Sequence, residues 1–578
     1  MRAMSTSSWV KPASLAWLAM SLSACAQSPA QLPNMAPNMR VSEALPLPPA
    51  RQELTSQVLY QFLLGEIAGQ RGELKLSAEA YADLAVRTRD ARIAKRATEA
   101  ALYARLPQLA LKNASLWQEL EPTSPKALQT LSTLLIGAGR MSEARPYLDA
   151  WVKTGEGGAV FLQLHGLFAR QKDKNAVLDL VENLAVGYPA YPEARFAVAQ
   201  AAWNAGKGAK ALAGLDETIR LKSNWAPAPL FKAQILQQMQ GEAAALAFLA
   251  DYLASAPGES EVRLAYAKQL ARASRFGESR TQFELLAQEM PGNPENHLAI
   301  GLIAMQTNDF DSAESSFTKA LELKHPDEGS VRFHLGQLAE ARGRLEQALV
   351  WYRSVIKGRQ KLDAHLRAAM ILSKQGRAAD ALQGLSNLAA ADDEERVKIA
   401  QAEAQIMREA GNFEGAVVAL SKALEKMPDS PDLLYDRAMA AEKINRLDLV
   451  ESDLRHLIAL KPNYAHAYNA LGYTLADRTP RLKEALELLE KALSLSPDDP
   501  FILDSMGWAL FKSKRYAEAA DMLRRAHAAQ PDPDIAAHLG EALWMNGDKD
   551  EARRIWSGSL QNHPGNESLR ETTSRLKP

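Results

Sequence analysis

A period of about 34 residues constrains the fold of this chain more than any other feature of its sequence. Each unit holds a Leu-Gly or similar small pair, an alanine about twelve residues later, and usually a large apolar residue four positions beyond that alanine. The pattern is carried by Gly301, Ala313, Gly336, Ala348, Gly472, Gly507, Ala519, Gly540 and Ala552. Such a period predicts a stack of supersecondary units, each burying its apolar face against its neighbours.

The composition of each unit and the positions of its glycine, alanine and proline residues predict a pair of antiparallel helices. Helix-forming residues dominate, and alternating β-branched runs bounded by glycine are hard to find. Two helices approach closely only where glycine or alanine removes side-chain bulk, so Gly301 is expected to face Ala313. Proline near the end of many units stops the second helix, because its ring lacks an N–H and restricts the preceding residue. We therefore expect an all-α chain of helical hairpins.

These spacings resemble the tetratricopeptide repeat (TPR). About fifteen repeats of about 34 residues would account for the span 54–565, with 294–361 and 465–565 the clearest units, and 566–578 is expected to form a capping helix. A stack of this length is expected to coil into a right-handed superhelix whose concave surface is lined by first helices. A coiled coil would not contain Gly and Pro at regular intervals of about 34 residues, and a globular helical bundle would not show a repeating sequence pattern.

The N-terminal 1–24 is expected to be an export signal, because Arg2 and Lys11 precede or flank an apolar stretch at 13–22. That stretch is too short to cross a bilayer, which takes roughly 20 helical residues. The four residues that end at Cys25, LSAC, resemble the bacterial lipobox, and Cys25 is the only cysteine in the chain. Lipidation of Cys25 is the favoured interpretation, and the alternative is an ordinary secretory signal with Cys25 as a bystander.

The segment 25–53 is expected to be a flexible tether between the lipid and the repeats. It lacks a helical period and contains Pro29, Pro33, Pro37, Pro46, Pro48 and Pro49. The alternative is a disordered leader without function, which would have the same composition. Ala26 follows the cysteine where an aspartate would favour inner-membrane retention, so we expect an outer-membrane lipoprotein that faces the periplasm.

The net charge and the absence of catalytic motifs argue against nucleic-acid binding and against an enzyme. The 68 basic and 69 acidic residues give a net charge of -1, so no positive excess exists to neutralise a nucleic-acid backbone. Zinc-protease, nucleophile-elbow and P-loop motifs are missing, and ten histidines are scattered without ligand spacing, so we expect no catalysis, cofactor or metal. Ser316 and Lys319 satisfy a bare Ser-x-x-Lys spacing, but Phe317 between them occupies a repeat packing position.

Repeat geometry predicts which side chains of the C-terminal units point into the groove. The residue just after the small position of each first helix, and the residues four before and three after that residue, are expected to face the groove. In the C-terminal repeats these are Asn469, Tyr473, Asp504, Trp508, Phe511, Glu541 and Trp544. Aromatic rings beside amides and carboxylates suit recognition of peptide segments or partner helices. The alternative is that these aromatic residues pack between neighbouring repeats.

Two stretches carry a closer resemblance. One comprises residues 471–479 (LGYTLADRT), 504–508 (DSMGW) and 537–541 (AHLGE), and the other comprises 64–68 (LGEIA) and 95–98 (KRAT). Together with the lipobox they resemble the large TPR lipoproteins of Gram-negative bacteria, among them the adaptor of a periplasmic carboxyl-terminal processing protease. The resemblance implies an adaptor that gathers this protease and its substrates, typically peptidoglycan hydrolases. The alternatives are a pilotin-like assembly factor and a scaffold in exopolysaccharide or cell-wall machinery.

Overall fold

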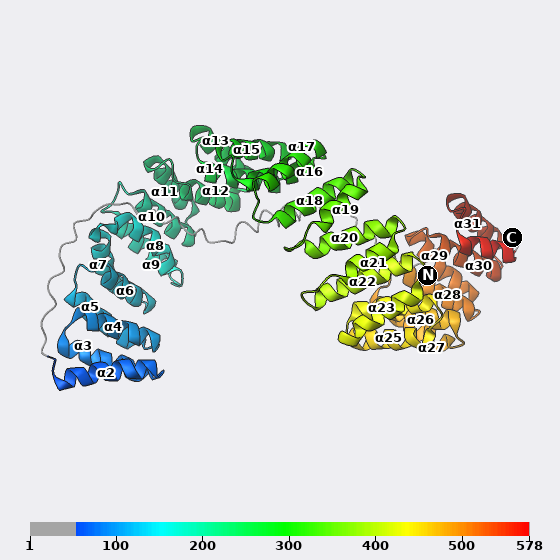
Figure 1. Cartoon of the computed structure of the whole chain (residues 1–578), viewed down its shortest axis with the longest axis horizontal. Coiled ribbons are helices and arrows are strands. Elements are labelled where there is room, and N and C mark those ends of the chain that lie inside the picture. Colours follow the sequence, from blue (N-terminus) through cyan, green and yellow to red (C-terminus); the bar gives the residue numbers. More distant parts are fainter. Residues whose placement is uncertain (1–53, 577–578) are drawn as a thin grey trace. The chain divides into compact units, whose positions relative to one another are not determined.

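The computed structural model describes residues 54–576, apart from the side chains of 155–157, and all regular elements within this range are helices (Figure 1). The predicted signal peptide, the lipidated Cys25 and the tether lie outside the described residues. The described chain divides into two compact units, 54–307 and 308–576. Among the described helices, none has the length and apolarity needed to cross a bilayer.

The first unit contains fifteen α-helices and one short π-helical segment. In chain order they are α2 (Ser56–Gln70), α3 (Leu74–Thr88), α4 (Ala91–Tyr103), α5 (Pro107–Leu120), α6 (Pro125–Gly137), α7 (Met141–Trp151), the π segment (Val152–Glu156), α8 (Gly157–Phe168), α9 (Lys174–Ala185), α10 (Pro192–Asn204), α11 (Gly208–Leu221), α12 (Pro227–Gln240), α13 (Glu242–Ser255), α14 (Ser260–Arg272), α15 (Phe276–Glu289) and α16 (Pro294–Gln306).

The second unit contains sixteen α-helices. They are α17 (Phe310–Glu322), α18 (Glu328–Ala341), α19 (Leu345–Arg353), α20 (Lys361–Lys374), α21 (Ala378–Ser386), α22 (Asp393–Glu409), α23 (Phe413–Lys426), α24 (Pro431–Lys443), α25 (Leu447–Leu460), α26 (Ala465–Arg478), α27 (Leu482–Leu495), α28 (Pro500–Lys512), α29 (Tyr516–Ala529), α30 (Pro533–Asn546), α31 (Lys549–Asn562) and α32 (Glu567–Leu576). Taken in consecutive pairs, α2 to α31 make fifteen pairs, which confirms the predicted all-α repeat fold.

Short turns with a left-handed residue join the helices of many pairs. Gly343 between α18 and α19 has φ 69°, and Lys514 between α28 and α29 has φ 63°. The residue after each returns a backbone hydrogen bond to the preceding helix, from Arg344 to Ala339 at 2.8 Å and from Arg515 to Leu510 at 3.0 Å. This geometry satisfies carbonyls at the helix end and reverses the chain.

The first helices of the last pairs begin with an acidic cap followed by proline. The Asp499 carboxylate accepts hydrogen bonds from the backbone N–H groups of Phe501 and Ile502 at 2.9 and 3.2 Å, and Pro500 occupies the first helical turn. Asp532 and Pro533 do the same for α30. Capping satisfies backbone N–H groups that have no hydrogen-bond partner inside the helix. Proline is tolerated in the first turn because an N–H at that position would make no hydrogen bond within the helix.

Small residues bring the two helices of a pair together, and a large residue fills the adjacent space. A Cβ added at Gly336 would lie 2.5 Å from the Tyr352 ring, and one added at Gly507 would lie 2.5 Å from Leu523. Gly472 approaches Leu489 and Gly540 approaches Trp556 in the same way. All nine glycine and alanine positions of the sequence pattern are buried; Gly301 lies in α16 and Ala313 in α17.

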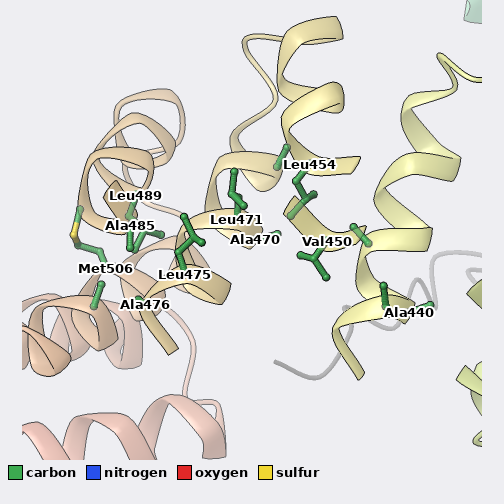
Figure 2. Close-up of a cluster of buried hydrophobic side chains, with 14 of the residues drawn as sticks. Ala440, Val450, Leu454, Ala470, Leu471, Leu475, Ala476, Ala485, Leu489 and Met506 are labelled. Carbon is green, nitrogen blue, oxygen red and sulfur yellow. The ribbon is translucent and has the colours of Figure 1, made fainter. Parts of the chain in front are cut away.

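Apolar residues from successive pairs merge into continuous cores rather than one core per pair. Figure 2 shows part of the largest core, in which Leu471 and Leu475 of α26 and Leu489 of α27 belong to the same buried cluster as Val450 of α25 and Met506 of α28. Each hairpin therefore covers the apolar face of the next one. This placement of the first helices side by side creates the candidate site.

Candidate partner-binding surface

Five side chains from three successive first helices form a connected group, which we call the C-terminal cluster. It comprises Tyr473 and Asp477 of α26, Asp504 and Trp508 of α28, and His538 of α30. α28 packs directly against both α26 and α30. Because first helices of adjacent repeats lie next to each other, residues about one period apart in sequence meet in this cluster.

Trp508 links all three helices. Its indole N–H donates a hydrogen bond to Asp477 Oδ1 at 3.1 Å, and its ring stacks on His538 with centroids 4.2 Å apart. The Phe511 ring lies parallel to it at 5.0 Å, and the Lys512 ammonium lies 5.3 Å from the ring centroid. Aromatic pairs of this kind contribute about 0.5–1.5 kcal/mol beyond the area that they bury. Trp508 is therefore held in one position.

Asp504 and His538 form an ion pair within the cluster. Nδ1 of His538 lies 2.9 Å from one carboxylate oxygen of Asp504 and 3.1 Å from the other. Burial alone would lower the pKa of His538, but the negative charge and hydrogen bond of Asp504 outweigh it and raise the pKa above its ordinary value. The protonated imidazole is thus favoured in the folded protein.

Tyr473 lies within the electrostatic influence of three carboxylates. Burial raises the pKa of its hydroxyl strongly, and the negative charges of Asp477, Asp504 and Glu442 raise it further. The Asp477 carboxyl differs: although burial opposes ionisation, the hydrogen bond from Trp508 and nearby cations lower its pKa. The cluster therefore combines a phenol whose neutral form is favoured with an Asp477 carboxyl whose ionised form is favoured.

Carboxylates lie deep on this surface and cations lie above them. Glu442 and Asp477 are largely buried, and the half-exposed Arg478 guanidinium lies 3.5 Å from Glu442 and 3.2 Å from Asp477. Arg575 of α32, more than half exposed, reaches the buried Glu541 at 2.7 Å. On this surface, the exposed cations therefore pair with carboxylates that are less exposed than they are.

The structure places the seven predicted contact residues in different environments. Tyr473, Asp504, Trp508 and Phe511 lie together and are partly exposed, whereas Trp544 packs instead against Trp556 of α31, with centroids 5.9 Å apart. Two of the seven, Asn469 and Glu541, are only 3% and 4% exposed. Their helices have neighbours on both sides, so these two side chains lie inside the stack and do not form accessible surface.

Sequence reasoning missed two members of the cluster, Asp477 and His538, although the sequence carried a signal for both. His538 follows Asp504 by 34 residues, one repeat, and Asp477 follows Tyr473 by four residues on the same helix. Applying the repeat period to charged residues, and not only to small ones, would have paired Asp504 with His538.

The chemistry available here is recognition by stacking, hydrogen bonding and charge. Within residues 54–576, no group of three or more His, Cys, Asp or Glu side chains is arranged to hold a metal. The Ser-x-x-Lys pair noted in the sequence has its Lys319 ammonium 3.0 Å from Glu322, next to the fully buried Phe317. Lys319 is therefore an exposed residue of α17 that is engaged in a surface ion pair.

Comparison with known proteins places the chain in a family. The tetratricopeptide-repeat family model matches residues 298–362, 451–500 and 505–567. Cellulose synthase operon protein C of Pseudomonas fluorescens is 24% identical over 46% of this chain and 22% of its own length. The solved structure of yeast Tom70 covers 73% of this chain and 94% of its own, with 16% identity and a TM-score of 0.33.

A TPR repeat-containing protein of Pseudomonas aeruginosa matches almost the whole repeat region. It is 33% identical to this chain over 485 residues, which cover 84% of this chain and 82% of the relative. The shared length extends well beyond the segments that match the repeat model, so the likeness is not limited to the common repeat positions. The chain therefore belongs to the family of tetratricopeptide-repeat proteins.

Proposed function

We propose that this protein is a non-catalytic adaptor, anchored to the outer membrane through lipidated Cys25, that binds partner proteins in the periplasm. Tetratricopeptide repeats form protein-interaction scaffolds, and the chain contains fifteen consecutive helix pairs. The observation that carries the proposal is the C-terminal cluster, in which Trp508 is locked by Asp477 and His538. A rigid aromatic residue costs little entropy when a partner covers it, which favours binding.

The partners that we propose are a carboxyl-terminal processing protease and its peptidoglycan hydrolase substrates. This proposal rests on the sequence resemblance of residues 64–68 and 471–479 to the large TPR lipoproteins that include such an adaptor. Holding protease and substrate on one scaffold raises their effective concentration to the millimolar range or so, and this speeds degradation without a catalytic group on the scaffold.

A second candidate is a scaffold in polysaccharide export. It is favoured by the similarity over 46% of this chain to cellulose synthase operon protein C. That similarity covers only 22% of the relative, so it extends to a minor part of that protein. The two candidates predict different partners.

Affinity recovery after crosslinking in intact cells tests both candidates. A tagged chain is compared with its Trp508→Ala variant and with a Tyr103→Ala control, whose ring is exposed in the other unit. We expect the protease and wall hydrolases to be recovered with the unchanged chain and the control, and weakly with Trp508→Ala. Secretin, pilus or polysaccharide-export components would replace the adaptor proposal by an assembly role.

Two further measurements bear on the other parts of the proposal. Cys25→Ser should move the protein from the membrane to the soluble periplasmic fraction, and continued membrane association would contradict lipid anchoring. Proteolysis or muropeptide hydrolysis by the purified chain alone would contradict a non-catalytic role. Circular dichroism of the Trp508→Ala variant shows whether lost recovery reflects lost folding.

A further inference from the structure

The first helix of the chain's repeat stack exposes an apolar surface. Leu59, Tyr60, Phe62, Leu63 and Ile67 of α2 are each 39% to 63% exposed, and we call this set the α2 face. Eleven of the twenty exposed large apolar residues in the described chain lie within residues 54–103. Scattered exposed apolar residues are normal, but a contiguous group on one helix marks an interaction surface.

Within the described part of the chain, this face remains open because α2 packs against a neighbouring helix, α3, on one side only. Figure 1 shows α2 at the start of its unit beside α3. Its buried residues are Gly65 and Ala68, and the Ser77 hydroxyl of α3 donates a hydrogen bond to the Gly65 carbonyl at 2.7 Å. By contrast, α26 inside the stack buries nine residues. The side of α2 that a preceding repeat would cover carries apolar residues without a cover.

The last helix of the stack is built differently. α32 exposes Glu567, Arg570, Glu571 and Arg575 and buries Leu569. A repeat array needs polar outer faces on its terminal repeats to stay soluble. The C-terminal end meets this requirement, whereas among residues 54–576 the α2 end does not.

The charges of α2 favour a second copy as a cover for this face. Glu66 is the only charged residue of α2, and its carboxylate is engaged by the Tyr81 hydroxyl and by the Arg96 guanidinium, the latter at 3.3 Å. Two α2 faces can therefore meet without opposing unpaired charges. A helix that lies on a membrane surface usually carries Lys and Arg on its polar face, and α2 carries neither.

We propose that two copies of this chain associate through their α2 faces in a twofold symmetric dimer. An apolar patch is complementary to itself, as an isologous interface requires. The preceding segment 26–53 is a less suitable cover, because its prolines lack the N–H and the freedom of φ that a helix packed on α2 would need. The proposal is independent of the partners proposed above.

Sedimentation of the full mature chain tests the dimer. With Cys25→Ser to remove the lipid, we expect a mass of two chains at micromolar concentration. Tyr60→Glu combined with Leu63→Glu should weaken the association at least about a hundredfold, because both copies bring carboxylates into the apolar interface. Val350→Glu, at a residue 66% exposed on α19, is the matched control and should leave the dimer intact. Far-ultraviolet circular dichroism checks that all variants fold.

A thiol introduced by Tyr60→Cys shows whether the α2 faces meet. Because Cys25 is the only native cysteine, the Cys25→Ser background carries a single thiol at position 60. A short bis-maleimide should link two chains there, whereas Val350→Cys should give no linked product. A monomeric mass overturns the proposal. In that case, a thiol protected from alkylation identifies segment 26–53 as the cover, and sedimentation with anionic phospholipid vesicles identifies a lipid surface.

Discussion

Gly336→Ala should destabilise the repeat formed by α18 and α19. The new Cβ would lie 2.5 Å from two ring atoms of Tyr352, which is fully buried. The ring has little freedom to move, because its hydroxyl donates a hydrogen bond to Glu340 at 2.7 Å and Arg367 lies 3.2 Å from the same carboxylate. Overpacking of this kind costs about 1–3 kcal/mol, and replacing glycine inside a helix returns about 0.5–1 kcal/mol. We expect a net loss of about 1–2 kcal/mol.

Gly558→Ala is the matched control for this prediction. Gly558 lies inside α31, has no heavy atom within 4 Å of an added Cβ, and is exposed. The same chemical change should therefore stabilise α31 by about 0.5–1 kcal/mol. Hydrogen exchange followed by mass spectrometry is the assay, because long repeat arrays do not unfold in one step and local protection must be compared.

Protection of the α18 and α19 peptides should fall in Gly336→Ala and protection of α31 should rise in Gly558→Ala. Adding Tyr352→Leu to Gly336→Ala should recover part of the loss, since the smaller side chain leaves room for the methyl group. Unchanged or increased protection of α18 in Gly336→Ala would refute the packing argument.

Three further outcomes are expected. The pKa of His538 is raised in the folded chain, so its ion pair with Asp504 contributes its full stabilisation of α28 and α30 below the unfolded histidine pKa of about 6.5. This stabilisation is lost as the pH rises through the pKa of His538 in the folded chain. Asp504→Asn should abolish the resulting pH dependence of hydrogen exchange in these two helices. Asp453→Ala should lower the local stability of its repeat, measured by hydrogen exchange, by about 3 kcal/mol, because Arg437 loses two hydrogen bonds of 2.6 and 2.8 Å to a carboxylate that is 2% exposed. Cys25→Ser should leave the circular dichroism spectrum of the repeats unchanged, since residue 25 precedes every described helix.

The repeat spacing predicted the helix pairs well because the required contacts are local. Gly336 lies in α18 and Tyr352 in α19, and the single turn between these two helices brings the residues together within one hairpin. The candidate site was predicted less completely. The spacing predicted a groove position for Trp508 but not its contacts with Asp477 and His538, and it predicted an accessible Asn469, whose side chain is buried.

The sequence alone determined the class of fold, the number of helix pairs and the small residues at their contacts. These follow from a period of about 34 residues, and each hairpin needs only its own residues to form. The tertiary structure decided which side chains remain accessible, which charges pair, and that among residues 54–576 the apolar face of α2 stays exposed while α32 exposes charged residues. Those properties depend on how neighbouring hairpins are staggered against each other, and shifts of a few ångströms between packed helices change which side chains meet without changing the repeat pattern.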